Sequence, residues 1–140
     1  AFAAAATCAL AELDAERARL AALREQLVAG VLRSIPDTEL LGDPVERLPG
    51  NAHVLFAGAI GETLLFLLDQ ADIAASTGSA CQAGVAESSH VVQALGRTDA
   101  EARQVLRFTL GRTSTEADVD ALLAALPDTV ARARTAFRLR

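Results

Sequence analysis

Apolar positions follow a helical period over the first part of the chain. Residues 3–29 contain neither glycine nor proline, and their leucines recur at mostly three- and four-residue steps. That spacing gives an apolar stripe along a helix, and the Ala, Leu, Glu and Arg that fill the segment are strong helix formers. We therefore predict a long amphipathic helix that ends near Gly30, before Ile35 and Pro36. Its stripe consists of Leu10, Leu13, Leu20, Leu23 and Leu27.

The clearest strand pattern lies at Val105–Leu110, where apolar and polar side chains alternate. A period of two places every second residue on the same face of a strand, so Arg107 and Thr109 face away from the core. The predicted core face takes Leu106, Phe108 and Leu110.

Shorter segments fill the middle of the chain, where residues 37–50 are rich in proline and glycine and predict mostly turn. The further strands that we predict are Thr38–Leu41, Ala52–Ala57 and Ile73–Ser76. The further helices are Glu62–Ala71, Ser89–Leu95 and a short helix after Thr98. Helices and strands mix without βαβ regularity, which predicts an α+β fold with a small, largely antiparallel sheet covered by helices.

A closing helix is predicted near the end of the chain. Thr113 and Glu116 have the spacing of a capping box at its start. The helical pattern runs to Leu126, and Pro127 either kinks the helix or begins a second one that ends near Phe137.

Composition limits the class of protein. A length of 140 residues indicates one domain, and 51% hydrophobic residues argue against intrinsic disorder. The net charge of −5 and the pI near 5.0 argue against binding to nucleic acid or to an anionic membrane. Residues 1–11 are uncharged but have no basic segment before them and are too short to span a bilayer, so we predict neither a targeting signal nor a membrane anchor.

The absence of lysine and the absence of methionine are both informative. All 13 basic residues are arginine, and the sequence has no methionine. A chain without lysine forms no lysine Schiff base, and a chain without methionine has lost its initiator or is a piece of a longer protein. Cys8 and Cys81 do not make a disulfide framework, so we expect the reducing cytoplasm. Because Cys8 falls in the predicted helix, we expect it to be a buried structural thiol.

Cys81 and Arg107 are the residues best suited to chemistry. Cys81 lies in the small-residue segment 77–86, and such a loop packs weakly and can move. No basic neighbour in sequence lowers its pKa, so a functional thiol and an incidental loop cysteine both remain open. An arginine held on a strand is suited to bidentate carboxylate binding, although a solvated or salt-bridged strand arginine is the commoner case. Neither His53 nor His90 has a metal-ligand partner at suitable spacing, so we predict no metal site.

The motifs around these residues resemble, in order, the C-terminal part of cysteine desulfurases, which are fold-type I pyridoxal-phosphate enzymes. The resemblance covers about residues 46–136, and the ordered set is specific although each piece alone is weak. Ser88 stands where that family often has proline. The matching segments are Leu48–Asn51, Gly61–Glu62 with Leu64 and Leu65, Ser76–Cys81, Glu87–Val91, Ala94–Gly96, Arg107–Arg112 and Thr115–Glu116.

The resemblance implies roles for both residues. Cys81 matches the cysteine on the family's mobile loop, here residues 77–87, whose thiolate attacks the sulfur of the substrate–cofactor adduct and becomes a persulfide. Arg107 matches the arginine that binds the carboxylate of L-cysteine. The loop resembles that of the longer-loop group, which supplies sulfur to iron–sulfur scaffold proteins.

The resemblance also implies what this chain lacks. The family's cofactor lysine, the histidine stacked on the pyridoxal ring and the aspartate at its nitrogen belong to a large N-terminal domain with no counterpart here. We therefore expect residues 1–35 to be the interdomain helix and residues 36–140 the small domain of a homodimeric enzyme. We expect no pyridoxal phosphate on this chain alone, and no activity without the other domain.

Two alternatives remain open. Selenocysteine lyases have similar loop and arginine motifs. A stand-alone sulfur-carrier or interaction module would keep Cys81 without ever binding a cofactor.

Overall fold

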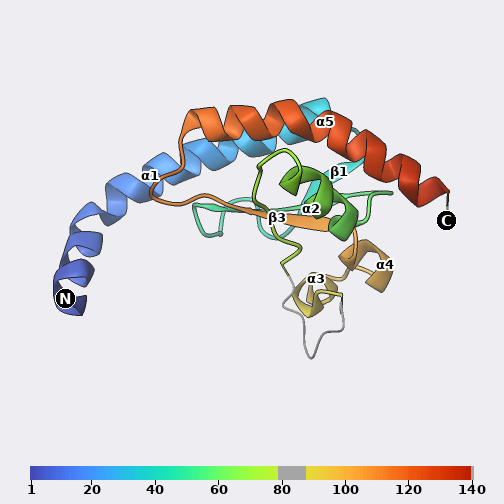
Figure 1. Ribbon diagram of the computed structural model, residues 1–140. Coiled ribbons are helices and arrows are strands. Elements are labelled where there is room, and N and C mark those ends of the chain that lie inside the picture. The colour runs from blue at the N-terminus through green and yellow to red at the C-terminus, as the bar shows by residue number, and fades with distance from the viewer. Residues whose placement is uncertain (79–87, 140) are drawn as a thin grey trace.

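The computed structural model describes residues 1–78 and 88–139, which form helices around one small antiparallel sheet (Figure 1). The elements are α1 (Phe2–Ser34), β1 (Thr38–Leu40), β2 (Asn51–Phe56), α2 (Gly61–Asp69), α3 (His90–Ala94), α4 (Asp99–Ala102), β3 (Val105–Thr109) and α5 (Glu116–Arg138). The strand order is β1-β2-β3, and both pairs are antiparallel. The predicted α+β fold is confirmed.

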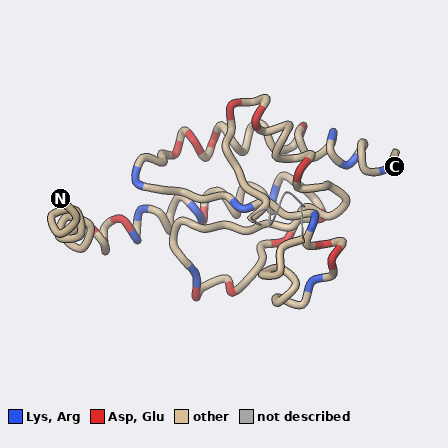
Figure 2. Tube along the Cα trace, turned by 60° about the horizontal axis from the view of Figure 1, so that its bottom comes forward, with Lys and Arg blue, Asp and Glu red and all other residues tan. Residues whose placement is uncertain are grey.

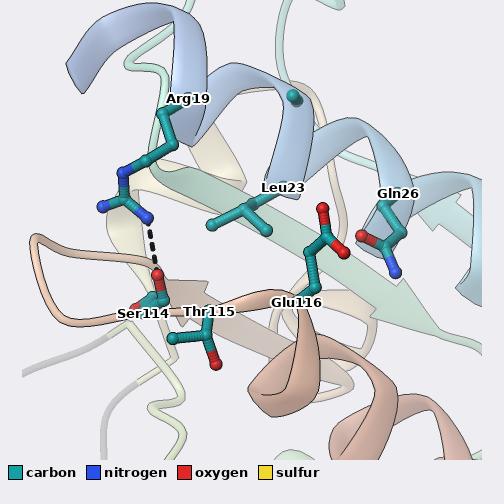
Figure 3. A pocket seen from close by; sticks show the side chains of 7 residues that line it. Arg19, Leu23, Gln26, Ser114, Thr115 and Glu116 are labelled. Atoms are coloured by element: carbon teal, nitrogen blue, oxygen red, sulfur yellow. Dashed lines mark hydrogen bonds between the residues drawn. The ribbon is translucent and has the colours of Figure 1, made fainter. Parts of the chain in front are cut away.

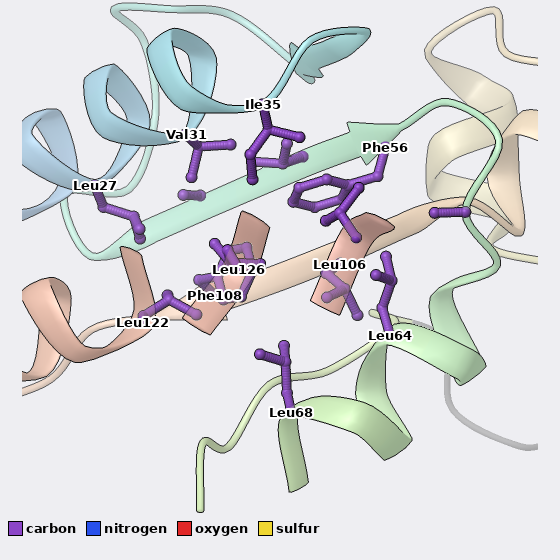
Figure 4. Packing of buried hydrophobic residues seen from close by; sticks show 14 of the residues in the cluster. Leu27, Val31, Ile35, Phe56, Leu64, Leu68, Leu106, Phe108, Leu122 and Leu126 are labelled. Atoms are coloured by element: carbon purple, nitrogen blue, oxygen red, sulfur yellow. The ribbon is translucent and has the colours of Figure 1, made fainter. Parts of the chain in front are cut away.

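The main core lies on one face of the sheet, under α1, α2 and α5 (Figure 4). Val54 and Phe56 from β2 and Leu106 and Phe108 from β3 supply the sheet side of this core. The rings of Phe56 and Phe108 meet edge to face, with centroids 6.4 Å apart. The helices add Leu27, Val31, Leu64, Leu68, Leu122, Leu126 and Val130, among others.

Only the second half of α1 belongs to this core. Leu27 is fully buried, whereas Leu10 is 72% exposed and Leu13 46% exposed, so only the C-terminal part of the predicted apolar stripe packs against the rest of the chain. A helix of 33 residues is about 50 Å long and extends beyond a three-stranded sheet. Its uncharged first turns stand apart from the rest of the chain (Figures 1 and 2). Cys8 lies on this free end and is exposed, which corrects the expected burial for the same reason.

The predicted strand Ile73–Ser76 does not form. The amide of Ile73 donates to the carbonyl of Leu68 at the end of α2, and Gly78 has a φ of +79°, which is not a strand conformation. Between these two constraints only Ser76 pairs with β3, as an isolated bridge to Arg107.

The closing helix begins two residues later than the sequence pattern predicts. The hydroxyl of Ser114 accepts from the amide of Gly111, and the amide of Ser114 donates to the Gly111 carbonyl. This turn delays the helix, so Thr115 and Asp118 form the capping box that we expected at Thr113 and Glu116. Pro127 lies inside α5 and does not divide it.

Within residues 1–78 and 88–139, no helix has both the length and the apolarity needed to cross a membrane.

The two halves of α1 predict opposite responses to the same substitution. Leu27→Ala leaves a cavity in the core and should lower the free energy of unfolding by about 2–5 kcal/mol. Leu10→Ala is the matched control and should change it by less than about 0.5 kcal/mol. Urea denaturation of the two variants measures both values. Equal losses would show that the free end of α1 is packed in solution.

Candidate functional site

Arg107 is held in the middle of β3 by backbone bonds to Ser76. The amide of Ser76 donates to the Arg107 carbonyl at 3.1 Å, and the amide of Arg107 donates to the Ser76 carbonyl at 2.6 Å. Both backbone groups of Arg107 therefore point away from β2, where its register partner is His53. The His53 carbonyl likewise points away, because it accepts from the amide of Leu41 at 2.8 Å. The pair is thus of the non-hydrogen-bonded type, which brings opposed side chains closer together.

The face of the sheet opposite the main core divides into two parts. Its apolar part consists of Leu41, Leu55 and Val105, which Val92 of α3 and Ala102 of α4 cover. Its polar part consists of Asn51, His53, Arg107 and Thr109, which the register pairs as Asn51 with Thr109 and His53 with Arg107. The prediction that Arg107 faces away from the core is confirmed, because Leu106 and Phe108 on either side of it are buried in the core.

Two nitrogens in this polar part lack a hydrogen-bond partner. Among the described residues, His53 Nε2 and Arg107 Nε are the only buried side-chain polar atoms without one. An unpaired buried polar group costs about 1–3 kcal/mol, so such groups call for an explanation. Here both belong to one cross-strand pair.

The pKa of His53 is lowered. Burial is the larger cause, because it disfavours the charged imidazolium, and the neighbouring guanidinium of Arg107 adds to the effect. His53 is therefore neutral at pH 7, and Arg107 is the cation of the pair.

Gly78 closes one side of the His53–Arg107 pair. A Cβ atom on Gly78 would lie 3.2 Å from His53 Cε1 and 3.3 Å from His53 Nε2, and the φ of +79° also favours glycine. The amide of Gly78 donates to Ser76 Oγ at 3.0 Å. The segment that leads toward Cys81 is thus anchored against His53 and Arg107, while Cys81 itself lies outside the described residues.

The described residues resume at Ser88, the position where cysteine desulfurases often have proline. The Ser88 hydroxyl donates to the Asp99 carboxylate and accepts from Gln93 Nε2 at 2.9 Å. The Ser88 hydrogen bond, followed by one from Arg103, lowers the pKa of Asp99. Serine therefore supplies here a link to α3 and α4 that proline could not make.

Arg19 is a structural residue that the sequence pattern did not single out. It donates from α1 to the carbonyls of Ser114 at 2.6 Å and of Gly111 and Arg112 at 3.1 Å each, and it pairs with Glu16 at 2.9 Å. It lines a small pocket between α1 and the start of α5 (Figure 3). All three carbonyls belong to the turn after β3, so Arg19 fixes the end of the strand that carries Arg107.

Residues 1–122 match the family described as "Aminotransferase class-V". The chain belongs to the class-V aminotransferase family. It is 55% identical over 137 residues to an IscS-like cysteine desulfurase of Mycobacterium tuberculosis (strain ATCC 25618 / H37Rv). The aligned region covers 96% of this chain and 35% of that protein. It is also 40% identical over 126 residues to the cysteine desulfurase NifS of Azotobacter vinelandii. That aligned region covers 90% of this chain and 31% of that protein.

Solved structures show the same fold. A NifS-like protein from Rickettsia africae ESF-5 superposes with a TM-score of 0.71 at 21% identity, over 84% of this chain and 30% of that one. A second NifS-like protein gives 0.75 at 25% identity, over 89% of this chain and 31% of that one. The resemblance to cysteine desulfurases is thus confirmed, and this class-V chain spans about a third of the length of the relatives it matches.

The class-V family implies pyridoxal phosphate, and the residues of this chain do not fit that cofactor by themselves. The sequence has no lysine to bind it covalently. The partnerless nitrogens of His53 and Arg107 suit a small anion.

The lowered pKa of His53 predicts a pH dependence of stability. Between the folded-state pKa and the ordinary value of about 6.5, the unfolded chain binds more protons than the folded chain. The free energy of unfolding should therefore fall as the pH drops from 7 through this window, and level off below the folded-state pKa. Urea denaturation between about pH 7 and pH 5 measures the fall.

His53→Gln is the matched control, because glutamine does not titrate and its fall in this window should be smaller. The carboxylates whose pKa is lowered, such as Asp99 and Asp118, lose their contribution at more acidic pH. An unchanged fall in His53→Gln would contradict the assignment to His53.

Proposed function

We propose that this chain is the C-terminal part of a cysteine desulfurase, which takes sulfur from L-cysteine as a persulfide on Cys81 and releases L-alanine. The observation that carries the proposal is Arg107, a backbone-anchored guanidinium whose Nε is buried without a partner on the polar part of the sheet. A guanidinium so placed suits a planar carboxylate. The names of the relatives support the same substrate.

Cys81 receives support from its position in the chain. It follows Gly78 by three residues, and three residues reach at most ~11 Å when fully extended. Gly78 in turn lies against His53 and Arg107. A thiol on this tether suits a substrate whose carboxylate Arg107 holds.

The sulfur transfer balances without an external oxidant or reductant. The Cys81 thiolate attacks the sulfur of bound L-cysteine, so an S–S bond forms as the C–S bond breaks. The electron pair goes to the β-carbon, which takes up the proton that the substrate thiol gives up. The products are L-alanine and a persulfide on Cys81.

The remaining parts of the proposal concern the whole enzyme. A large N-terminal domain holds pyridoxal phosphate, residues 1–35 link it to the small domain 36–140, and the full-length protein is a homodimer. A sulfur acceptor such as an iron–sulfur scaffold protein receives the persulfide. Such a thiol works in a reducing compartment, for which we propose the cytoplasm. This chain alone is inactive, because it has no lysine for the cofactor.

Arg107→Ala tests the carboxylate site in the full-length protein. Loss of a charge-assisted bidentate contact costs ~2–5 kcal/mol, so kcat/KM for L-cysteine should fall about 30- to several-thousand-fold. Arg107→Lys should recover little, because an ammonium does not reproduce the planar fork. Arg132→Ala, on the exposed side of α5, is the matched control and should keep wild-type kcat/KM. A near-normal value for Arg107→Ala would reduce this arginine to a structural role.

Cys81→Ala tests the sulfur transfer. The full-length variant should still bind pyridoxal phosphate and change its spectrum when L-cysteine is added, yet form almost no alanine or persulfide. Cys81→Ser should behave in the same way, because a hydroxyl is a far poorer nucleophile than a thiolate. Alanine release and peptide mass analysis after alkylation measure both products.

Cys8→Ala is the control for general thiol effects, because Cys8 is exposed on the free end of α1. It should leave turnover unchanged. Extra sulfur found on Cys8, or wild-type turnover in Cys81→Ala, would overturn the assignment.

A further inference from the structure

His53 and Arg107, whose side chains carry the two partnerless nitrogens, are neighbours because the pairing of β2 with β3 places them opposite each other. The two residues come from different strands and are far apart in sequence, but the register opposes them in a closely spaced pair. Within residues 1–78 and 88–139, no other buried side-chain polar atom lacks a partner. A packing defect would explain one such atom. Two in one pair indicate a shared ligand.

The donor chemistry of the pair defines that ligand. The Nε of an arginine always carries a hydrogen, and a neutral imidazole carries one hydrogen on either of its nitrogens. With the proton on His53 Nε2, the pair presents two N–H groups and one positive charge. A carboxylate, with two acceptor oxygens and one negative charge, satisfies both. Because both nitrogens are buried, their hydrogen bonds to an anion are stronger than they would be in water.

We infer that His53 Nε2 is a second hydrogen-bond donor to the carboxylate held by Arg107, which makes His53 a substrate-binding residue. This inference rests on the proposed function for the identity of the substrate, L-cysteine. The alternative is that His53 is only a packing residue against Gly78. A Cβ atom placed on Gly78 would lie 3.3 Å from His53 Nε2, so the two residues are in close contact. The two roles predict different results for substitutions that keep or remove a donor.

The first measurement needs no enzymatic activity. In this chain, NMR of the imidazole Cε1–H signals gives the pKa of His53 in propionate and in chloride at equal ionic strength. A carboxylate bound beside the imidazole stabilises its charged form, so propionate should raise the pKa of His53 by roughly half a unit to one unit. His90, the only other histidine, is exposed on α3 and should respond equally to both salts.

Arg107→Gln should abolish the propionate effect on His53, because the carboxylate loses its main contact. A His53 pKa that is the same in both salts overturns the inference. So does a rise that persists in Arg107→Gln, because the anion would then bind elsewhere.

The second measurement uses the full-length protein and two matched variants. Glutamine places its amide N–H₂ near the position of the imidazole Nε2, whereas leucine fills similar space without a donor. His53→Leu should raise KM for L-cysteine by about 10- to 100-fold, as expected for a lost hydrogen bond to a charged group. His53→Gln should stay within about threefold of wild type.

Equal KM values for His53→Leu and wild type, or equal increases in both variants, would leave His53 a packing residue and overturn the inference. Failure of the proposed function looks different. The wild-type full-length protein would then release no alanine from L-cysteine, while the propionate experiment would still decide whether the pair binds a carboxylate.

Discussion

The antiparallel register between β2 and β3 assigns each side chain of the sheet to one of two faces. With Val54 opposite Leu106 and His53 opposite Arg107, one face of both strands packs against α1 and α5. His53 and Arg107 lie on the other face. A slip of one residue would reverse every side chain of a strand and bury Arg107 in the main core. The cost of that burial without a partner holds the register in place.

The same register concentrates unsatisfied polar groups at one point. Folded chains pair nearly all their buried donors. Among residues 1–78 and 88–139, the exceptions are His53 Nε2 and Arg107 Nε. Places where a chain breaks a rule that it obeys elsewhere are commonly functional sites. The burial of Leu27, Phe56 and their neighbours supplies the stability that offsets the cost.

Local patterns predicted elements well and their ends less well. The alternation around Arg107 and the apolar leucines near Leu27 gave the correct faces, because side-chain period follows from backbone geometry alone. The capping box begins at Thr115 and not at Thr113, because Ser114 hydrogen-bonds to Gly111 in a turn that precedes the helix. Ile73–Ser76 has the composition of a strand, but contacts with α2 and the turn at Gly78 leave room for one bridge. Leu10 and Cys8 are apolar residues of the kind found in a core, but they are exposed because α1 extends beyond the sheet.

The sequence by itself determined that this chain is α+β, that Arg107 faces away from the core and that Cys81 lies in a segment of small residues. Each of these follows from neighbours within a few positions. Only the tertiary structure decided that His53 stands beside Arg107, that Ser76 and Gly78 brace them, and that two donors there lack partners. Strand register depends on packing between residues distant in the chain, and no local pattern contains that information.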